Sequence, residues 1–333
     1  MTRTFSICIL LLAAMTLNAQ QATHLRLTGP YLGQKPPGLT PELLAPGFVS
    51  TGLQEGPCAF TPSGDECVFM VSYRKPHSKK AFAALTRTKM VNGQWSAPQF
   101  LPFSGKDFAD IYPFISYDGK ELFFASTRPT GKAELKNQVN LWRSKRVKDA
   151  WGEPEALPYP INGRGDVSGP SLSLNGRFYF TLASDSGSAI YGSPYQDGSF
   201  GEPRKLPESI NVKEGPFDGV ISPDGSYYVV SVYNRADSFG GTDLYVSFRI
   251  DNDHWTPLKS LGAAVNSRLN EGSALITSDG KYIFFSGCLV SHGFYEDNIT
   301  YSILLNNSLK PQYGSSDVYW VSARIIELLR PKE

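Results

Sequence analysis

The chain of 333 residues contains few of the side chains from which metal and catalytic sites are built. Its only histidines, His24, His77, His254 and His292, stand singly, without a second ligand at metal-site spacing. It also lacks the Gly-x-Ser-x-Gly motif and a following segment of α/β-hydrolase size, which excludes a prolyl-peptidase architecture. We therefore expect no catalytic residue, no metal site and no cofactor that these motifs would identify.

Charge of one sign and long apolar runs are scarce as well. The 32 Lys and Arg residues nearly balance the 31 Asp and Glu residues, and the net charge is +1. This balance, with no cluster of basic residues, argues against a nucleic-acid partner. No apolar run has the length that a membrane-spanning helix needs. We expect a monomer without a membrane span.

The N-terminus has the pattern of a signal peptide. Arg3 supplies a positive start, residues 5–15 are apolar, and Ala19 closes a cleavage site ahead of Gln20. Cys8 lies inside the apolar stretch, where it is poorly placed for lipid attachment. The pattern predicts a signal peptide over residues 1–19, an extension over 20–40, one domain over 41–333, and a periplasmic or secreted protein.

The chain repeats itself, and turns mark the repeat. Gly and Pro are abundant, at 31 and 24 residues, and 13% of residues are aromatic, as in all-β chains with many turns. Five turns end in glycine, at spacings of 49 to 57 residues: Gly64, Gly119, Gly176, Gly225 and Gly280. Since Gly at this turn position supplies a positive φ, each turn is expected to close a β-hairpin.

Three strand patterns complete each repeat. The run after each turn is continuously apolar, as in a strand buried on both faces (residues 67–71, 122–125, 178–181, 227–230 and 282–285). In most copies a third strand and then a Trp- or Phe-containing fourth strand follow. Four strands per repeat predict a β-propeller of five blades, with six blades or a β-sandwich as alternatives.

The first and last repeats are incomplete in a complementary way. The fifth copy ends after its third strand, near Ile326, whereas residues 41–49 resemble a fourth strand and precede the first copy. Pairing of the two would remove an exposed sheet edge. We therefore expect an N-terminal strand to close the ring.

The repeats resemble the WD-like propeller repeat of TolB and of many exported bacterial proteins. Ser222-Pro223-Asp224-Gly225 and the run from Gly240 to Tyr245 carry the resemblance, as do Ser116-Tyr117-Asp118-Gly119 and Asn140-Leu141-Trp142. It covers about residues 41–326. It implies the fold but no single function, and a TolB-type propeller would have six blades and a separate N-terminal domain.

Charged residues recur at one end of the expected ring. A carboxylate precedes the first strand of every copy: Glu55, Asp110, Asp166, Glu214 and Glu271. Arg74, Arg128 and Arg235 lie in loops between second and third strands, which open at the same end. These residues are candidates for a polar-ligand or Ca²⁺ site at the channel mouth. The other interpretation is a girdle of salt bridges between blades.

Two further features concern one blade each. The longest connection, residues 287–316, contains Phe294, Tyr295, Tyr301 and Tyr313, and suggests a contact surface on the same face. Cys58 and Cys67 flank the first hairpin. They would face each other and form a disulfide if the turn were centred between Pro62 and Ser63; otherwise they would be buried thiols.

The sequence favours a non-catalytic exported module that binds an envelope protein or a small polar or carbohydrate ligand. The alternative is an enzyme acting on carbohydrate or peptide, with two of the channel-mouth carboxylates as acid and base.

The ring-closure hypothesis predicts the effect of a truncation. Deleting residues 1–50 removes the closing strand and exposes the edge of the last blade. The truncated protein is expected to melt several degrees below the mature protein in a thermal denaturation experiment. Melting within a degree or two of the mature protein would contradict closure.

Overall fold

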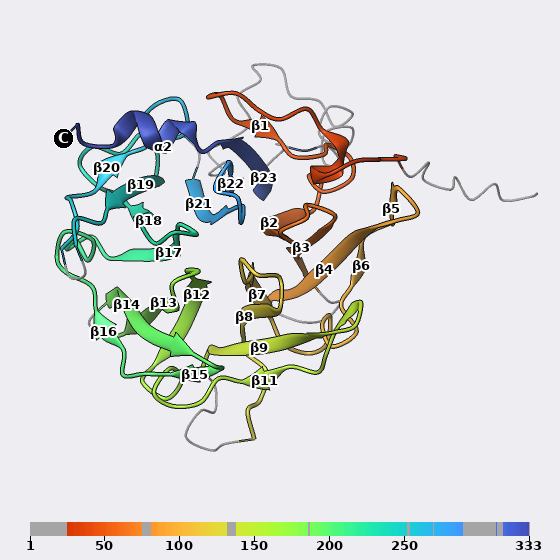
Figure 1. The fold of residues 1–333 in the computed structure, drawn as a ribbon, viewed down its shortest axis with the longest axis horizontal. Coiled ribbons are helices and arrows are strands. Elements are labelled where there is room, and N and C mark those ends of the chain that lie inside the picture. Colours follow the sequence, from red (N-terminus) through yellow and green to blue (C-terminus); the bar gives the residue numbers. More distant parts are fainter. Residues whose placement is uncertain are drawn as a thin grey trace, which may run out of the picture.

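The computed structural model describes residues 25–74, 81–131, 138–185, 187–251, 254–268, 270–288, 311 and 316–332. The predicted signal peptide lies outside these residues. Five antiparallel sheets surround a central axis, with the first strand of each sheet innermost (Figure 1). The predicted five-bladed β-propeller is therefore confirmed.

The first three strands of each blade follow one another outward from the axis, and in blades 1 to 3 two short strands both pair with the third. Blade 1 contains β2 (Gln54–Phe60), β3 (Glu66–Arg74), β4 (Ala81–Val91), β5 (Gln94–Trp95) and β6 (Gln99–Phe100). Blade 2 contains β7 (Asp110–Ile115), β8 (Glu121–Ser126), β9 (Asn140–Val147), β10 (Ala150–Trp151) and β11 (Glu155–Ala156). Blade 3 contains β12 (Asp166–Leu172), β13 (Arg177–Ser184), β14 (Gly187–Gln196), β15 (Ser199–Phe200) and β16 (Arg204–Lys205).

The last two blades have four strands each. Blade 4 contains β17 (Pro216–Ile221), β18 (Tyr227–Tyr233), β19 (Thr242–Phe248) and β20 (Lys259–Ser260). Blade 5 contains β21 (Asn270–Ile276), β22 (Tyr282–Cys288), β23 (Ser316–Ser322) and β1 (Glu42–Leu43). A 3₁₀ turn, η1 (Tyr31–Gly33), precedes the ring, and α2 (Arg324–Leu329) follows it.

The hairpin turns form as their residues predict. All five turn glycines have positive φ, between 67° and 76°. In each turn a Ser or Thr hydroxyl accepts a hydrogen bond from the first backbone N–H of the second strand: Thr61, Ser116, Ser173, Ser222 and Thr277. The second strands are buried on both faces, as Phe123 and Val229 illustrate with no exposed surface.

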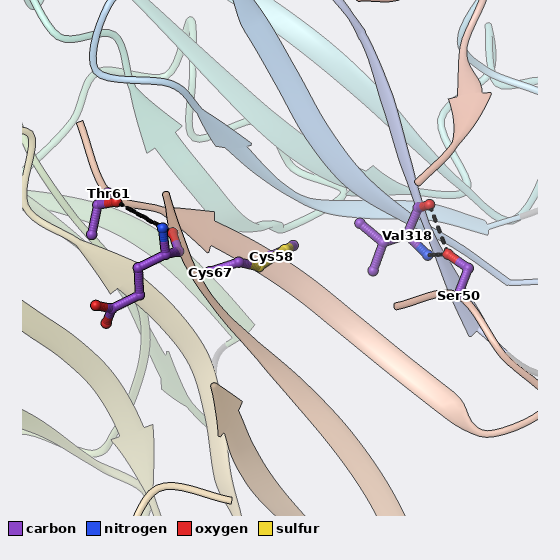
Figure 2. Close-up of a disulfide and its surroundings, with 6 residues drawn as sticks. Ser50, Cys58, Thr61, Cys67 and Val318 are labelled. Atoms are coloured by element: carbon purple, nitrogen blue, oxygen red, sulfur yellow. Dashed lines mark hydrogen bonds between the residues drawn. A yellow bond between two sulfur atoms is a disulfide. The ribbon is translucent and has the colours of Figure 1, made fainter. Parts of the chain in front are cut away.

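The ring closes through the N-terminal strand, as expected. Glu42 pairs with Trp320 and Leu43 with Tyr319 in antiparallel register. Beyond this short strand, the Ser50 hydroxyl accepts a hydrogen bond from the Val318 N–H (3.2 Å) and donates one to the Val318 carbonyl (3.1 Å; Figure 2). The outermost strand of blade 5 is therefore supplied from the opposite end of the chain.

Ser50 belongs to a set of five equivalent side chains, which we call the lead-in clamps. Each lies in the loop leading into one blade and accepts a hydrogen bond from a third-strand N–H of the preceding blade. The pairs are Ser50 with Val318, Ser104 with Leu85, Asn162 with Leu141, Asn211 with Ile190, and Asn266 with Leu244. The three asparagines also donate to the carbonyl of the same third-strand residue. Every blade is thus tied to the next.

A disulfide joins Cys58 of β2 to Cys67 of β3 (Figure 2), with 6.4 Å between the Cα atoms. The two residues are not directly opposite, because Phe60 pairs with Cys67 and Cys58 pairs with Phe69. This register centres the turn between Ser63 and Gly64, one residue beyond the centre at which the two cysteines would face each other. The bridge therefore runs diagonally between neighbouring pairs, and its Cα separation lies within the range that a disulfide spans.

Replacing Ser50 tests the contribution of its lead-in clamp to ring closure without removing the closing strand β1. Ser50→Ala leaves the buried Val318 N–H and carbonyl without their side-chain partner, which is expected to lower the free energy of unfolding by about 1–3 kcal/mol. Urea denaturation measures this change. Ser278→Ala, on a turn of the same blade, serves as the control and is expected to stay within about 0.5 kcal/mol of wild type. Equal effects of the two changes would contradict the role of the clamp.

Candidate functional site

The propeller has two unlike faces. The loop face carries the lead-in loops and the connections between second and third strands, and the turn face carries the five glycine turns. All eight charged candidate residues lie at or near the loop face, where strand order placed them. The long connection that was expected to form a contact surface lies outside the described residues from 289 to 315, apart from Pro311.

Three of the candidate carboxylates are buried and bonded to their own lead-in loops. Glu55, Asp110 and Glu271 expose at most 2% of their surface. Their carboxylates accept hydrogen bonds from the hydroxyls of Thr51, Ser104 (2.6 Å) and Ser267, respectively. These bonds fix the loop that leads into each blade, so the three acids have a structural use.

The other two carboxylates occupy different positions. Asp166 is exposed and accepts a hydrogen bond from the Val139 N–H (2.8 Å). Glu214 is half-buried and lies two residues before β17 begins. The five acids therefore do not stand at equivalent register positions. Within the residues that the structure describes, no group of three or more His, Cys, Asp or Glu side chains is placed to hold a metal ion.

Arg128 is enclosed in a cage at the base of the loop face. Its guanidinium donates to the Asp110 carboxylate (2.7 Å), and both side chains are at least 90% buried. Four aromatic rings surround it, with ring centroids 4.5–5.6 Å from the guanidinium carbon: Phe103, Phe108, Phe124 and Trp142. Such cation–π contacts add to the ion pair because the site is dry. This arginine joins the lead-in loop to the body of blade 2.

The remaining candidate arginines are placed differently. Arg235 forms an ion pair with Asp237 (2.9 Å) and lies over the Tyr245 ring, 4.7 Å from its centroid. Arg74 is exposed at the end of β3. Of the expected arginines, Arg128 is the one that forms an ion pair with an expected ring carboxylate.

The channel axis carries a feature that we did not expect from the sequence. Every innermost strand has a two-residue β-bulge: Gly56-Pro57, Tyr112-Pro113, Gly169-Pro170, Asp218-Gly219 and Ser273-Ala274. Four of the bulge residues have positive φ, including the non-glycine residues Tyr112 (54°), Asp218 (48°) and Ser273 (54°). Prolines inside three of these strands signal such a bulge, because proline cannot join the ladder of hydrogen bonds.

The bulges bring polar groups of four blades together at Asp218. Burial raises the pKa of the Asp218 carboxyl to about 6, and hydrogen bonds from Tyr112, Ser273 and Ser168 oppose this shift. The backbone N–H of Asp218 donates to the Thr181 hydroxyl (3.1 Å). The residues around Asp218 line a cavity of about 20 Å³, close to the size of one water molecule. The space that the bulges leave at the axis is therefore small.

The larger cavities are open and lie away from the axis. A pocket of about 530 Å³ lies between blades 3 and 4 on the loop face, where Glu214 and Arg235 both line it. The turn face has pockets of about 590 Å³, next to α2, and about 400 Å³, between blades 1 and 2. Two of the eight candidate residues, Glu214 and Arg235, thus line the same open pocket. The buried acids Glu55, Asp110 and Glu271 do not line it.

Comparison with known proteins yields similarity of fold. No family model and no curated protein matches the sequence. The fold is similar to that of TolB from Acinetobacter baumannii, with 12% identity and a TM-score of 0.48, over 81% of this chain and 57% of the TolB chain. It is also similar to a thermostable family-43 glycoside hydrolase (11%, TM-score 0.47, 80% of this chain and 94% of that one) and to a luciferin-regenerating enzyme (11%, 0.45, 84% and 94%).

The chain is a five-bladed β-propeller. It spans little more than half the length of that TolB. At identities of 11–12%, these neighbours assign no activity, since one fold hosts many functions. Among the described residues, no helix has both the length and the apolar character needed to cross a bilayer.

The burial of Glu55 makes the stability of the protein depend on pH. Burial raises the pKa of the Glu55 carboxyl from its ordinary 4.5 to about 7, the hydrogen bond from Thr51 opposes this shift, and the negative charge of Asp317 adds to it. Its Oε2 atom is buried and has no hydrogen-bond partner among the described residues. Between these two pKa values the folded state binds the proton more tightly than the unfolded state, so this contribution is lost as the pH rises.

We expect Glu55→Gln to remove this part of the pH dependence. From about pH 5 to about pH 8, the free energy of unfolding of wild type should fall more than that of the variant, by up to about 3 kcal/mol. Urea denaturation at several pH values measures the difference, with the exposed Glu153→Gln as the control. The pKa of Asp218 is raised in both proteins, so its contribution cancels when the two pH profiles are subtracted. Parallel curves for wild type and Glu55→Gln would contradict the assignment.

Proposed function

We propose that the protein is an exported, non-catalytic binding protein that holds its ligand or partner on the loop face. The pocket of about 530 Å³ between blades 3 and 4 supports this proposal. Loops on a rigid scaffold are the usual place for binding residues, and open concave pockets are the usual sites for ligands. Export is inferred from the signal-peptide pattern of residues 1–19.

The buried acids support a binding role over catalysis. An acid–base pair of the glycosidase type needs two carboxyl groups that reach the substrate from opposite sides. Glu55, Asp110 and Glu271 are buried and hold their own lead-in loops. They are therefore poorly placed to act on a bound substrate.

An enzyme acting on carbohydrate or peptide is the second candidate function. One observation favours it: Glu208 and Glu214 both line the same open pocket. A pair of accessible carboxylates is the minimum that such hydrolysis requires. Turnover of a glycoside or peptide substrate that is lost in Glu214→Gln would support the enzyme and contradict the binding protein.

The binding proposal predicts which face a ligand occupies. Peptides selected from a random dodecapeptide phage library, and glycans from a glycan array, are tested for binding to the mature protein. Ala236→Trp fills the loop-face pocket and is expected to weaken binding at least tenfold. Ser278→Trp, in the pocket beside α2 on the turn face, is the matched control and should change the affinity less than twofold. Loss of binding in the control alone would move the site to the turn face.

A further inference from the structure

The loop-face pocket is built from three segments of the chain. The lead-in loop of blade 4 supplies Glu208, Ser209, Val212 and Glu214; the β18–β19 loop supplies residues 235–237; Pro257 and Leu258 precede β20. All three segments belong to blade 4 or to the loop that leads into it from blade 3. A pocket built in this way keeps its shape because Asn211, in the same lead-in loop, is bonded to Ile190 of blade 3.

One wall of the pocket is an arginine whose charge is already balanced. Arg235 is paired with Asp237 (2.9 Å), and its guanidinium carbon lies over the Tyr245 ring, 4.7 Å from the centroid. The Tyr245 hydroxyl donates to the same Asp237 carboxylate (3.1 Å), which completes the group. Burial raises the pKa of this hydroxyl well above its ordinary value, so it stays protonated as a donor. An anionic ligand would have to compete with Asp237 for Arg235.

The other two carboxylates of the pocket are not balanced in this way. Glu208 is exposed and Glu214 is half-buried. No hydrogen bond or ion pair within the described part of the chain uses either carboxylate. The Ser209 hydroxyl, also in the lining, is buried and has no hydrogen-bond partner there. The pocket thus has two free negative charges and one unsatisfied hydroxyl.

The floor of the pocket is apolar. Leu258 belongs to the hydrophobic cluster shared by blades 3 and 4, Val212 packs against that cluster, and Pro257 lies beside Leu258. A ligand that fits this lining has an apolar stem and a cationic end. Long basic side chains have this form, because they bury their methylene groups while the charged group stays at a polar rim.

We propose that this pocket binds a lysine or arginine side chain of a partner protein or peptide. This inference rests on the proposed binding function and names the chemistry of the ligand. The stem lies on Val212, Pro257 and Leu258, and the ammonium or guanidinium group reaches Glu208 and Glu214. The pocket opens on the loop face, so the backbone of a partner has room to cross it.

Fluorescence polarisation with defined peptides tests the proposal. The probe is a labelled, acetylated Gly-Lys-Gly-Lys-Gly amide, and the comparison peptides carry norleucine or glutamate in place of both lysines. We expect the lysine peptide to bind at least tenfold more tightly than either. Equal binding of the norleucine peptide, or tighter binding of the glutamate peptide, would overturn the proposal.

Matched variants locate the interaction. Glu214→Gln and Glu208→Gln are each expected to weaken binding of the lysine peptide at least threefold. The double variant is expected to weaken it at least tenfold. Glu153→Gln makes the same change of charge at an exposed site on blade 2 and is expected to have no effect. If the double variant binds the lysine peptide like wild type, Glu208 and Glu214 do not contact its positive charge, and the proposal is wrong. Competition with 1,5-diaminopentane distinguishes a free amine from a side chain: displacement at lower concentration than acetyl-lysine amide would overturn the assignment to a peptide.

Failure of this inference is distinguishable from failure of the binding function. If selected peptides or glycans bind, are blocked by Ala236→Trp, and carry no positive charge, the binding function stands and the basic ligand is wrong. If no selected peptide or glycan binds in a way that Ala236→Trp prevents, both the binding function and the basic ligand are wrong.

Discussion

The propeller depends on one repeated interaction, the hydrogen bond between a lead-in side chain and the third strand of the preceding blade. Two short polar residues, Ser and Asn, do this at all five junctions. Their acceptor atoms satisfy backbone N–H groups that would otherwise be buried without partners, a loss of about 1–3 kcal/mol each. Flanking leucines add a backbone bond to the same third-strand residue, as Leu101 does to Leu85 and Leu261 to Leu244. The blades are therefore fixed to one another by polar bonds as well as by their apolar faces.

The axis is held by a second set of contacts, and the two sets divide the protein into a rigid centre and an adaptable rim. At the centre, the bulges place Tyr112, Ser168 and Ser273 around the Asp218 carboxylate, so four blades share one buried group. Residues kept at positive φ are costly and persist where the surroundings fix them. The open pocket lies outside this centre, between two blades. Variation among its exposed lining residues, such as Glu208 and Ala236, leaves the central contacts around Asp218 unchanged.

The sequence revealed the fold more fully than the site. Turn glycines and apolar second strands have a local cause, so the number of blades followed from them, and ring closure followed from the incomplete first and last repeats. The carboxylates preceding the first strands are not equivalent, because spacing in the sequence does not fix the position of a residue along a strand that contains a bulge. Glu55 lies directly before its bulge, and Asp110 lies two residues before its own. Pro57, Pro113 and Pro170 marked three of those bulges. The loop-face pocket could not be predicted from the sequence, because its lining comes from three separate segments that share no local sequence pattern.

The pairing of chain ends in blade 5 also orders events in time. Ser50 is made early and its partner Val318 is 268 residues later, so their bond is among the longest loop closures in the chain. Contacts between such distant residues form slowly. A nascent chain holds four potential blades before the fifth is complete, and β23 is the last strand that the ring requires. The native ring is thus a state that the chain reaches only after nearly all of its strands are available to pair.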